Sequence, residues 1–271
     1  MDLLSPQIII LTLLMGSLAG FLAGLLGIGG GVILVPLFLW LFPLAGFPAE
    51  VIVHTAFGTS LAIILPTAIS STLGHRKRGN VDWHMVGFLA LGGVLGSLLG
   101  STAAAIIPGG ILKICFAVMQ IIISLKLLFY KTYIPTENQE QVKRTSLVLV
   151  GFAGGLFSAF FGMGGGVIAV PLMLIVLKLP IHLAVGNSSA LIVVSSFSAV
   201  ICYIWYGLQN PLETPFSIGY VNLLVTLLVA PLTIIFARFG VKLASLTSQA
   251  KLVKIFAVLL MCVGIKILLN L

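Results

Sequence analysis

Two glycine-rich segments contain the residues of this chain that are best suited to bind a ligand through the backbone. Residues 27–37 read GIGGGVILVPL and residues 162–172 read GMGGGVIAVPL, so one pattern occurs once in each half of the chain. Glycine leaves backbone N–H groups uncovered, and the helix after each run starts with unpaired N–H groups and a partial positive charge of about +0.5. Such a helix start suits an anion.

A second repeated motif could add neutral hydrogen-bond donors to the same site. Residues 54–60 read HTAFGTS and residues 182–188 read HLAVGNS, so both fit the pattern H-x-A-x-G-[TN]-S. The side chains that could hold an oxyanion without a buried arginine are those of Thr59, Ser60, Asn187 and Ser188. The histidines that begin the two motifs, His54 and His182, could relay a proton.

Each pattern also has a structural interpretation, which the sequence leaves open. Small residues let membrane helices pack closely, and residues 92–100 (GGVLGSLLG) have the spacing of such a packing face. Serine and threonine side chains in helices can hydrogen-bond back to their own backbone. The two histidines could simply lie at the membrane interface.

Composition identifies the class of protein. Apolar residues make up 60% of the 271 residues and charged residues only 7%, far below the roughly 25% of a soluble domain. Such a chain cannot cover a water-facing surface, so the sequence predicts an all-α polytopic membrane protein whose partner is the lipid bilayer. The net charge of +8 then reflects basic loops at one membrane face, and we expect no nucleic-acid partner.

The distribution of acidic residues narrows the class of ligand. All six fall in loops or at segment ends, namely Asp2, Glu50, Asp82, Glu137, Glu140 and Glu213. No carboxylate is then available inside the membrane for a cation site or a proton relay. The three cysteines lie in apolar segments without paired spacing, so we expect no metal and no cofactor. The expected partner is a small anionic substrate.

Ten apolar segments divide equally between two halves of the chain. They are 7–26, 28–43, 51–74, 84–107 and 110–130 in the first half, and 146–161, 163–178, 183–206, 216–237 and 250–270 in the second. Most reach the ~20 residues that cross a ~30 Å hydrocarbon core as a helix. The segments beside each glycine run are shorter, so we expect glycine-broken or re-entrant helices there.

The motif pairs and the loop charges predict two inverted-topology repeats. The first transmembrane repeat is 1–130, a cytoplasmic linker is 131–145, and the second repeat is 146–271. The 75–79 loop reads HRKRG, whereas the matching loop at 206–213 has no Lys or Arg. The positive-inside rule therefore places the 75–79 loop and the linker in the cytoplasm, and both termini on the other side of the cell membrane.

The two motif pairs resemble those of the sulfite exporter TauE/SafE family, also called the toluene-sulfonate uptake permease family, over nearly the whole chain. The resemblance implies a permease that moves a sulfur-containing anion, such as sulfite, a sulfonate, sulfoacetate or thiosulfate, by alternating access around a site near the membrane midplane. The substrate-binding residues that it implies are Gly29, Gly30, Gly31, Thr59, Ser60, Gly164, Gly165, Gly166, Asn187 and Ser188.

The sequence leaves other functions open. The same features fit an anion channel, or a carrier of another small organic anion such as a carboxylate. No HExxH motif, nucleophile elbow or intramembrane acid supports a membrane enzyme, so we expect no enzymatic activity. A homo-oligomer is compatible with the sequence, and a non-transporting scaffold would show no substrate-dependent flux.

The inverted orientation can be tested by labelling from either side of the membrane. Cysteines introduced as Arg78→Cys and Asn210→Cys should react with an impermeant thiol reagent from opposite sides, because the two loops occupy matching positions in repeats of opposite orientation. Labelling of both cysteines from the same side would contradict the inverted repeat.

Overall fold

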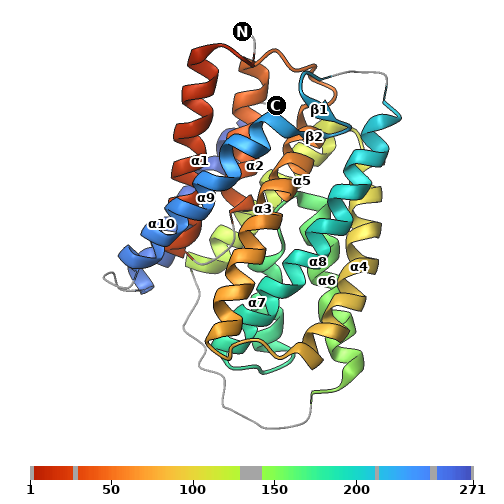
Figure 1. Cartoon of the computed structure of the whole chain (residues 1–271), viewed down its shortest axis with the longest axis vertical. Helices are drawn as coiled ribbons and strands as arrows, with labels where there is room; N and C mark the ends of the chain where they lie inside the picture. Colours follow the sequence, from red (N-terminus) through yellow and green to blue (C-terminus); the bar gives the residue numbers. More distant parts are fainter. Residues whose placement is uncertain (1–2, 27–29, 129–141, 211–213, 245–248, 270–271) are drawn as a thin grey trace.

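The computed structural model describes residues 3–26, 30–128, 142–210, 214–244 and 249–269. This described part contains ten helices and one short β-hairpin (Figure 1). The first five helices are α1 (Pro6–Leu26), α2 (Gly31–Leu44), α3 (Ile52–Lys77), α4 (Trp83–Ile106) and α5 (Gly109–Leu128). The second five are α6 (Arg144–Phe161), α7 (Gly166–Ile175), α8 (Ile181–Leu208), α9 (Leu223–Ala244) and α10 (Gln249–Leu269).

The predicted all-α polytopic membrane architecture is confirmed. Among the described residues, six helices are long and apolar enough to cross a membrane, namely α1, α3, α4, α5, α6 and α8. Helices α2 and α7 contain 14 and 10 residues. At ~1.5 Å per residue they extend only about 21 Å and 15 Å, less than the ~30 Å hydrocarbon core. The helices that follow the glycine runs are therefore short, as predicted.

Each of the ten predicted segments coincides with one helix, with one difference in the second half. The segment predicted at 216–237 starts with an antiparallel hairpin, β1 (Ser217–Ile218) and β2 (Val221–Asn222), which precedes α9. Phe216 and Gly219 have φ angles of 57° and 56°. These left-handed conformations are incompatible with a continuous right-handed helix, so α9 starts later than its apolar composition predicts.

The helices of the two halves are interleaved. Helix α4 packs along α6, and α9 packs along α1, so the fourth helix of each half lies against the first helix of the other. Helices α3 and α8 pack against each other, as do α5 and α10. Exchanging the halves therefore exchanges equivalent helix pairs, which is the packing expected of two related repeats. Their opposite orientation stays a prediction.

The ends of the chain lie at one end of the molecule. In Figure 1 the N and C marks lie on the same side as the β1–β2 hairpin, and the α3–α4 connection lies at the opposite end. Of the predicted 75–79 loop, residues 75–77 form the last turn of α3 and residues 78–79 belong to this connection. Their separation from the chain ends is the one that the predicted orientation requires. Most of the predicted linker, residues 131–141, lies outside the described residues.

Glycines bring the interleaved helices into backbone contact. A Cβ atom at Gly92 on α4 would overlap the carbonyl oxygen of Val148 on α6. One at Gly151 on α6 would overlap the carbonyl oxygen of Leu89 on α4. The packing interpretation of residues 92–100 is therefore confirmed.

This contact predicts that Gly92→Ala destabilises the fold, because the added methyl group must push α4 away from the backbone of α6. Overpacking of this kind costs about 1–3 kcal/mol, or roughly 2–10 °C in Tm. Gly87→Ala on the same helix is the matched control, since nothing lies within 4 Å of its Cβ position. Thermal unfolding in detergent measures both variants, and equal Tm values would contradict the contact.

Candidate functional site

The two glycine runs meet in the interior of the molecule. Gly31 is the first residue of α2, and a Cβ atom there would lie 2.5 Å from backbone atoms of Met163, inside the second run. Only a hydrogen atom fits at this position. The first residue of α2 therefore lies against the loop that precedes α7, whose first residue is Gly166, although the two segments are far apart in sequence.

The second run reaches this contact through left-handed backbone. Gly162 ends α6 with a φ of 65°, and Gly164 and Gly165 have φ angles of 78° and 71°. Glycine adopts these angles without the steric cost of other residues. In the first run Gly30 has a helical φ of −69°, and Gly29 lies outside the described residues. The two runs are thus alike in sequence but differ in backbone conformation.

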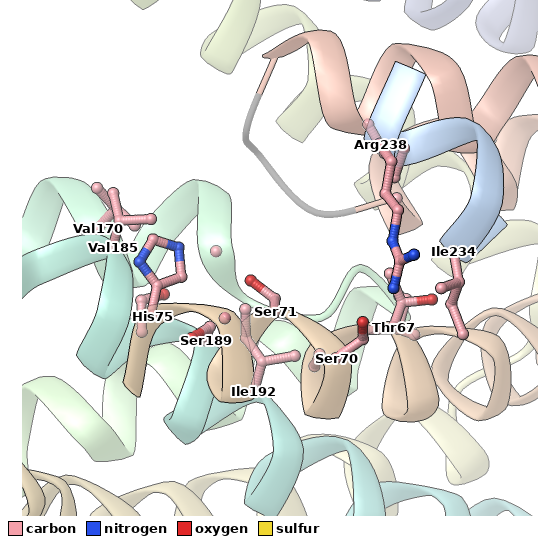
Figure 2. Close-up of a pocket in the computed structure, with 18 of the residues that line it drawn as sticks. Thr67, Ser70, Ser71, His75, Val170, Val185, Ser189, Ile192, Ile234 and Arg238 are labelled. Atoms are coloured by element: carbon pink, nitrogen blue, oxygen red, sulfur yellow. The ribbon is translucent and has the colours of Figure 1, made fainter. Parts of the chain in front are cut away.

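A cavity of about 570 Å³ lies beside this contact (Figure 2). Gly30 lines it just before α2, and Gly166 lines it at the start of α7. The C-terminal half of α3 forms one wall, and residues of α8 and α9 form others. Its polar and charged side chains are those of Thr67, Ser70, Ser71, His75, Arg78, Ser188, Ser189 and Arg238. Three predicted site residues, Gly30, Gly166 and Ser188, are therefore brought together here.

Ser188 contributes a buried hydroxyl group to the cavity. Its side chain is 1% exposed, and Oγ has no hydrogen-bond partner among the residues that the structure describes. The neighbouring Ser189 differs, because its Oγ donates to the carbonyl of Gly186 at 2.7 Å and accepts from Thr72 Oγ1 at 3.2 Å. The hydroxyl of Ser188 therefore keeps unused hydrogen-bonding capacity at the wall of the cavity, within the described residues.

Positive charge lines the outer part of the cavity. Figure 2 shows the guanidinium of Arg238 extending from α9 toward Thr67 on α3, with His75 at the other end of this wall. Within the described part of the chain, neither Arg238 nor Arg78 forms an ion pair, and no acidic residue lines the cavity. The cavity therefore presents an uncompensated positive field, which attracts anions.

The predicted site residues do not include Arg78 or Arg238, because the basic clusters predicted only the orientation of the chain. One signal was available for Arg238. Ile234, Ala237 and Arg238 have the i, i+3, i+4 spacing of one helix face, and all three line the cavity. A cation on the same face as apolar residues, near the end of a membrane segment, indicates an inward-facing charge.

Thr59 and Asn187, the matching residues of the second motif, do not line the cavity but make equivalent structural hydrogen bonds. Thr59 Oγ1 accepts from the backbone N–H of Asn222 at 2.9 Å, just before α9. Asn187 Oδ1 accepts from the backbone N–H of Asp82 at 2.9 Å, just before α4. The repeated motif thus attaches α3 to the start of α9 and α8 to the start of α4, which is the fourth helix of the other half in each case.

The other predicted residues that the structure describes are also outside the cavity, namely Gly31, His54, Ser60, Gly164, Gly165 and His182. Ser60 is fully buried, and its Oγ has no partner among the described residues. His54 Nε2 lies 3.1 Å from two carbonyl oxygens at the end of α4, and its ring stacks on Tyr220. His182 is exposed at the start of α8. The structure therefore places neither histidine of the proposed proton relay in the cavity, and His75 lines it instead.

Known proteins resemble this chain over nearly its whole length. Residues 12–267 match the family described as sulfite exporter TauE/SafE. A probable membrane transporter protein of Haemophilus influenzae is 32% identical over 267 residues, which are 97% of this chain and 98% of that protein. The probable membrane transporter protein MJ0441 of Methanocaldococcus jannaschii is 28% identical over 236 residues, 86% of this chain and 85% of its own. The probable membrane transporter protein YunE of Bacillus subtilis is 26% identical over 280 residues, 96% of this chain and 97% of its own. No solved structure matches the chain.

The hydrogen bond of Thr59 predicts that Thr59→Val lowers stability, because it leaves the buried N–H of Asn222 unpaired. The expected loss is about 1–3 kcal/mol, or roughly 2–10 °C in Tm. Thr59→Ser should restore the bond, and Ser188→Ala should not lower Tm, because its hydroxyl has no partner within the described residues. A Tm for Thr59→Val equal to that of the unmodified protein, measured by thermal unfolding, would contradict the structural role.

Proposed function

The chain belongs to the sulfite exporter TauE/SafE family and is a membrane transporter, and from this premise we propose that it moves a small sulfur-containing anion across the cell membrane. Sulfite, sulfonates, sulfoacetate and thiosulfate form the substrate class, and transport proceeds by alternating access. One observation carries this proposal. Two short helices that follow glycine runs, one from each half, start beside one cavity.

In this proposal the anion binds between the starts of α2 and α7. Partial positive charges at the two helix starts favour a negative charge between them. Ser188 supplies a hydroxyl donor, and its burial strengthens the bond because little water competes there. No acidic residue among the described lining opposes the anion. These contacts need no metal and no buried arginine.

We assign Arg238 and Arg78 to the capture of the anion rather than to its tight binding. Both side chains are exposed, so they act through the long-range field and not through a dehydrated ion pair. Arg78 belongs to the 75–79 loop, which the positive-inside rule places in the cytoplasm. The cavity then faces the cytoplasm, and the arginines raise the local anion concentration at its mouth.

A closed region beyond the cavity favours a carrier over a channel. Ser198 lies ten residues beyond Ser188 on α8, about 15 Å farther along the helix axis. There Ser97 Oγ and Ser198 Oγ are 2.6 Å apart, and Tyr203, which follows on α8, is fully buried. A channel needs a continuous path, whereas alternating access needs one side closed. A carrier of small carboxylates would use the same contacts and differ only in the size of the anion.

The other residues of the two motifs take structural roles in this proposal. Thr59 and Asn187 position the helices around the site through backbone hydrogen bonds. His54 holds the start of α3 against the end of α4. These residues then affect transport through stability, whereas Gly30, Gly166 and Ser188 affect it through substrate binding.

The proposal predicts saturable flux of sulfur anions in proteoliposomes, with different effects of two substitutions. Ser188→Ala should lower kcat/KM about tenfold, because the bound anion loses one buried donor. Arg238→Gln should raise KM about tenfold with little change in kcat, and added salt should reduce the difference, because capture is electrostatic. Flux of sulfite, sulfoacetate, thiosulfate, taurine and small carboxylates measures both effects.

The control is Arg144→Gln, which removes an arginine that stacks on Phe88 and does not line the cavity. It should transport normally. Unchanged flux in Ser188→Ala would remove the hydroxyl from the site. Faster transport of carboxylates than of any sulfur anion would favour the carboxylate carrier, and currents that do not saturate would indicate a channel.

A further inference from the structure

Aligning the two halves of the chain matches each residue that lines the cavity with a residue of the other half. Several of these matching residues lie on α8 and α4. Aligning α3 with α8 so that His54 matches His182 carries Thr67 onto Ser195 and Ser70 onto Ser198. The same alignment pairs Ser188 with Ser60. The cavity wall formed by α3 and the start of α8 thus has a counterpart formed by α8 and the start of α3.

The fourth helices of the halves can be aligned through their first turns. Asp82 and Asn222 each donate a backbone N–H to the second motif, and each caps the helix that follows. Matching these two residues carries Ala237 of the cavity onto Ser97. In the same way, matching the two glycine runs carries Ala23 of the cavity onto Ser158.

Three of the counterpart positions carry hydroxyl groups that have no partner within the described part of the chain. Ser60, Ser158 and Ser196 are each fully buried. Their Oγ atoms have no hydrogen-bond partner among the described residues. Burial of an unpaired hydroxyl is unfavourable, so a packing role does not explain three of them together. All three correspond to residues that line the open cavity, namely Ser188, Ala23 and Ala68.

One of the two regions is open, and the other is closed. Ser70 and Ala237 line the open cavity from α3 and α9. Their counterparts, Ser198 and Ser97, are in hydrogen-bond contact with Oγ atoms 2.6 Å apart. Ser70 and Ala237 therefore line the open cavity, whereas the matching Ser198 and Ser97 join α8 to α4.

We propose that the buried serines of α3, α6 and α8 form a second, closed vestibule for the same class of small anion. The Ser97–Ser198 contact keeps it shut in this state. It opens when α4 moves away from α8, and Ser60, Ser158 and Ser196 then donate hydrogen bonds to the anion on its way to the other side. This inference rests on the proposed function, because it assigns the second half of that transport path.

The second vestibule should bind the anion more weakly than the open cavity. Leu98 occupies the position that corresponds to Arg238, and Tyr206 the position that corresponds to Arg78. Hydroxyl groups alone then contact the anion, without a guanidinium at the mouth. Capture is therefore stronger from the side of the open cavity.

A reversible crosslink between the two gate positions tests the vestibule. Ser97→Cys and Ser198→Cys place two sulfur atoms where the oxygen atoms are 2.6 Å apart, within reach of a disulfide. The background carries Cys115→Ala, Cys202→Ala and Cys262→Ala. Oxidation should lower sulfite flux to about a tenth or less, and a reductant should restore it. Binding of sulfite to the open cavity should change less than about threefold, because that side stays accessible.

Each single-cysteine variant, oxidised in the same way, is the control and should keep its flux. Complete crosslinking, verified by the loss of free thiols, together with undiminished flux would overturn the proposal. Loss of sulfite binding on crosslinking would also overturn it, since the closed gate lies outside the open cavity.

A second measurement separates the vestibule from the proposed function, because it needs no substrate. Ser196→Cys should react with a negatively charged, impermeant methanethiosulfonate from the Asn210 side at least about tenfold faster than Ser124→Cys. Ser124 is equally buried, but its Oγ donates to the carbonyl of Ala257 between α5 and α10. Equal rates would overturn the vestibule even if the protein transports sulfite. A faster rate at Ser196→Cys without transport of any anion would support the vestibule and contradict the proposed substrate class.

Discussion

The site depends on one backbone contact, that of Gly31 with Met163. No side chain fits between the two segments, so the start of α2 can lie against the loop that precedes α7. Each helix start carries a partial positive charge of about +0.5, and two such charges repel each other in a medium of low dielectric constant. An anion between them removes this repulsion. Gly31 is therefore needed because any larger residue would separate the two segments. Their close approach lets a part of the chain without charged side chains attract an anion.

Because the helices of the two halves are interleaved, the packed units of the structure are not the same as the two sequence repeats. The site lies between such packed units. One buried apolar cluster contains Leu89 of α4, from the first half, together with Val150 of α6 and Met173 of α7, from the second. Backbone contacts through Gly92 and Gly151 hold α4 and α6 together within this unit. The cavity lies between this unit and helices α3 and α9. A change in the distance between the unit and these two helices would alter the cavity, while the glycine contacts between α4 and α6 stay intact.

Local pattern predicted the class of protein, the ten helical segments and the importance of the glycine runs, because each depends on composition and spacing along a short stretch. It did not predict the hairpin at 217–222, since apolar composition alone cannot reveal two left-handed residues. Nor did it separate Ser188 from Asn187, which are neighbours in one motif. Their roles differ because Asn187 meets the backbone N–H of Asp82, far away in sequence, while the hydroxyl of Ser188 meets no partner within the described residues.

The repeated motif illustrates how a structural constraint can look like a binding site. Thr59 and Asn187 recur at equivalent positions because each anchors the backbone before the fourth helix of a repeat. The serine that follows each of them recurs as well, and both serines lack partners among the described residues. One motif therefore combines a structural residue with a residue that faces the proposed transport path, and only the three-dimensional contacts distinguish them.

The most direct measurement of the central claim is the position of a bound anion. Selenite, a heavier analogue of sulfite, can be located by anomalous scattering in crystals of the protein. We expect a peak between the starts of α2 and α7, within hydrogen-bond distance of Ser188 Oγ. A peak only at the mouth beside Arg78 and Arg238, with none near Gly30 and Gly166, would contradict the claim that the two helix starts bind the anion.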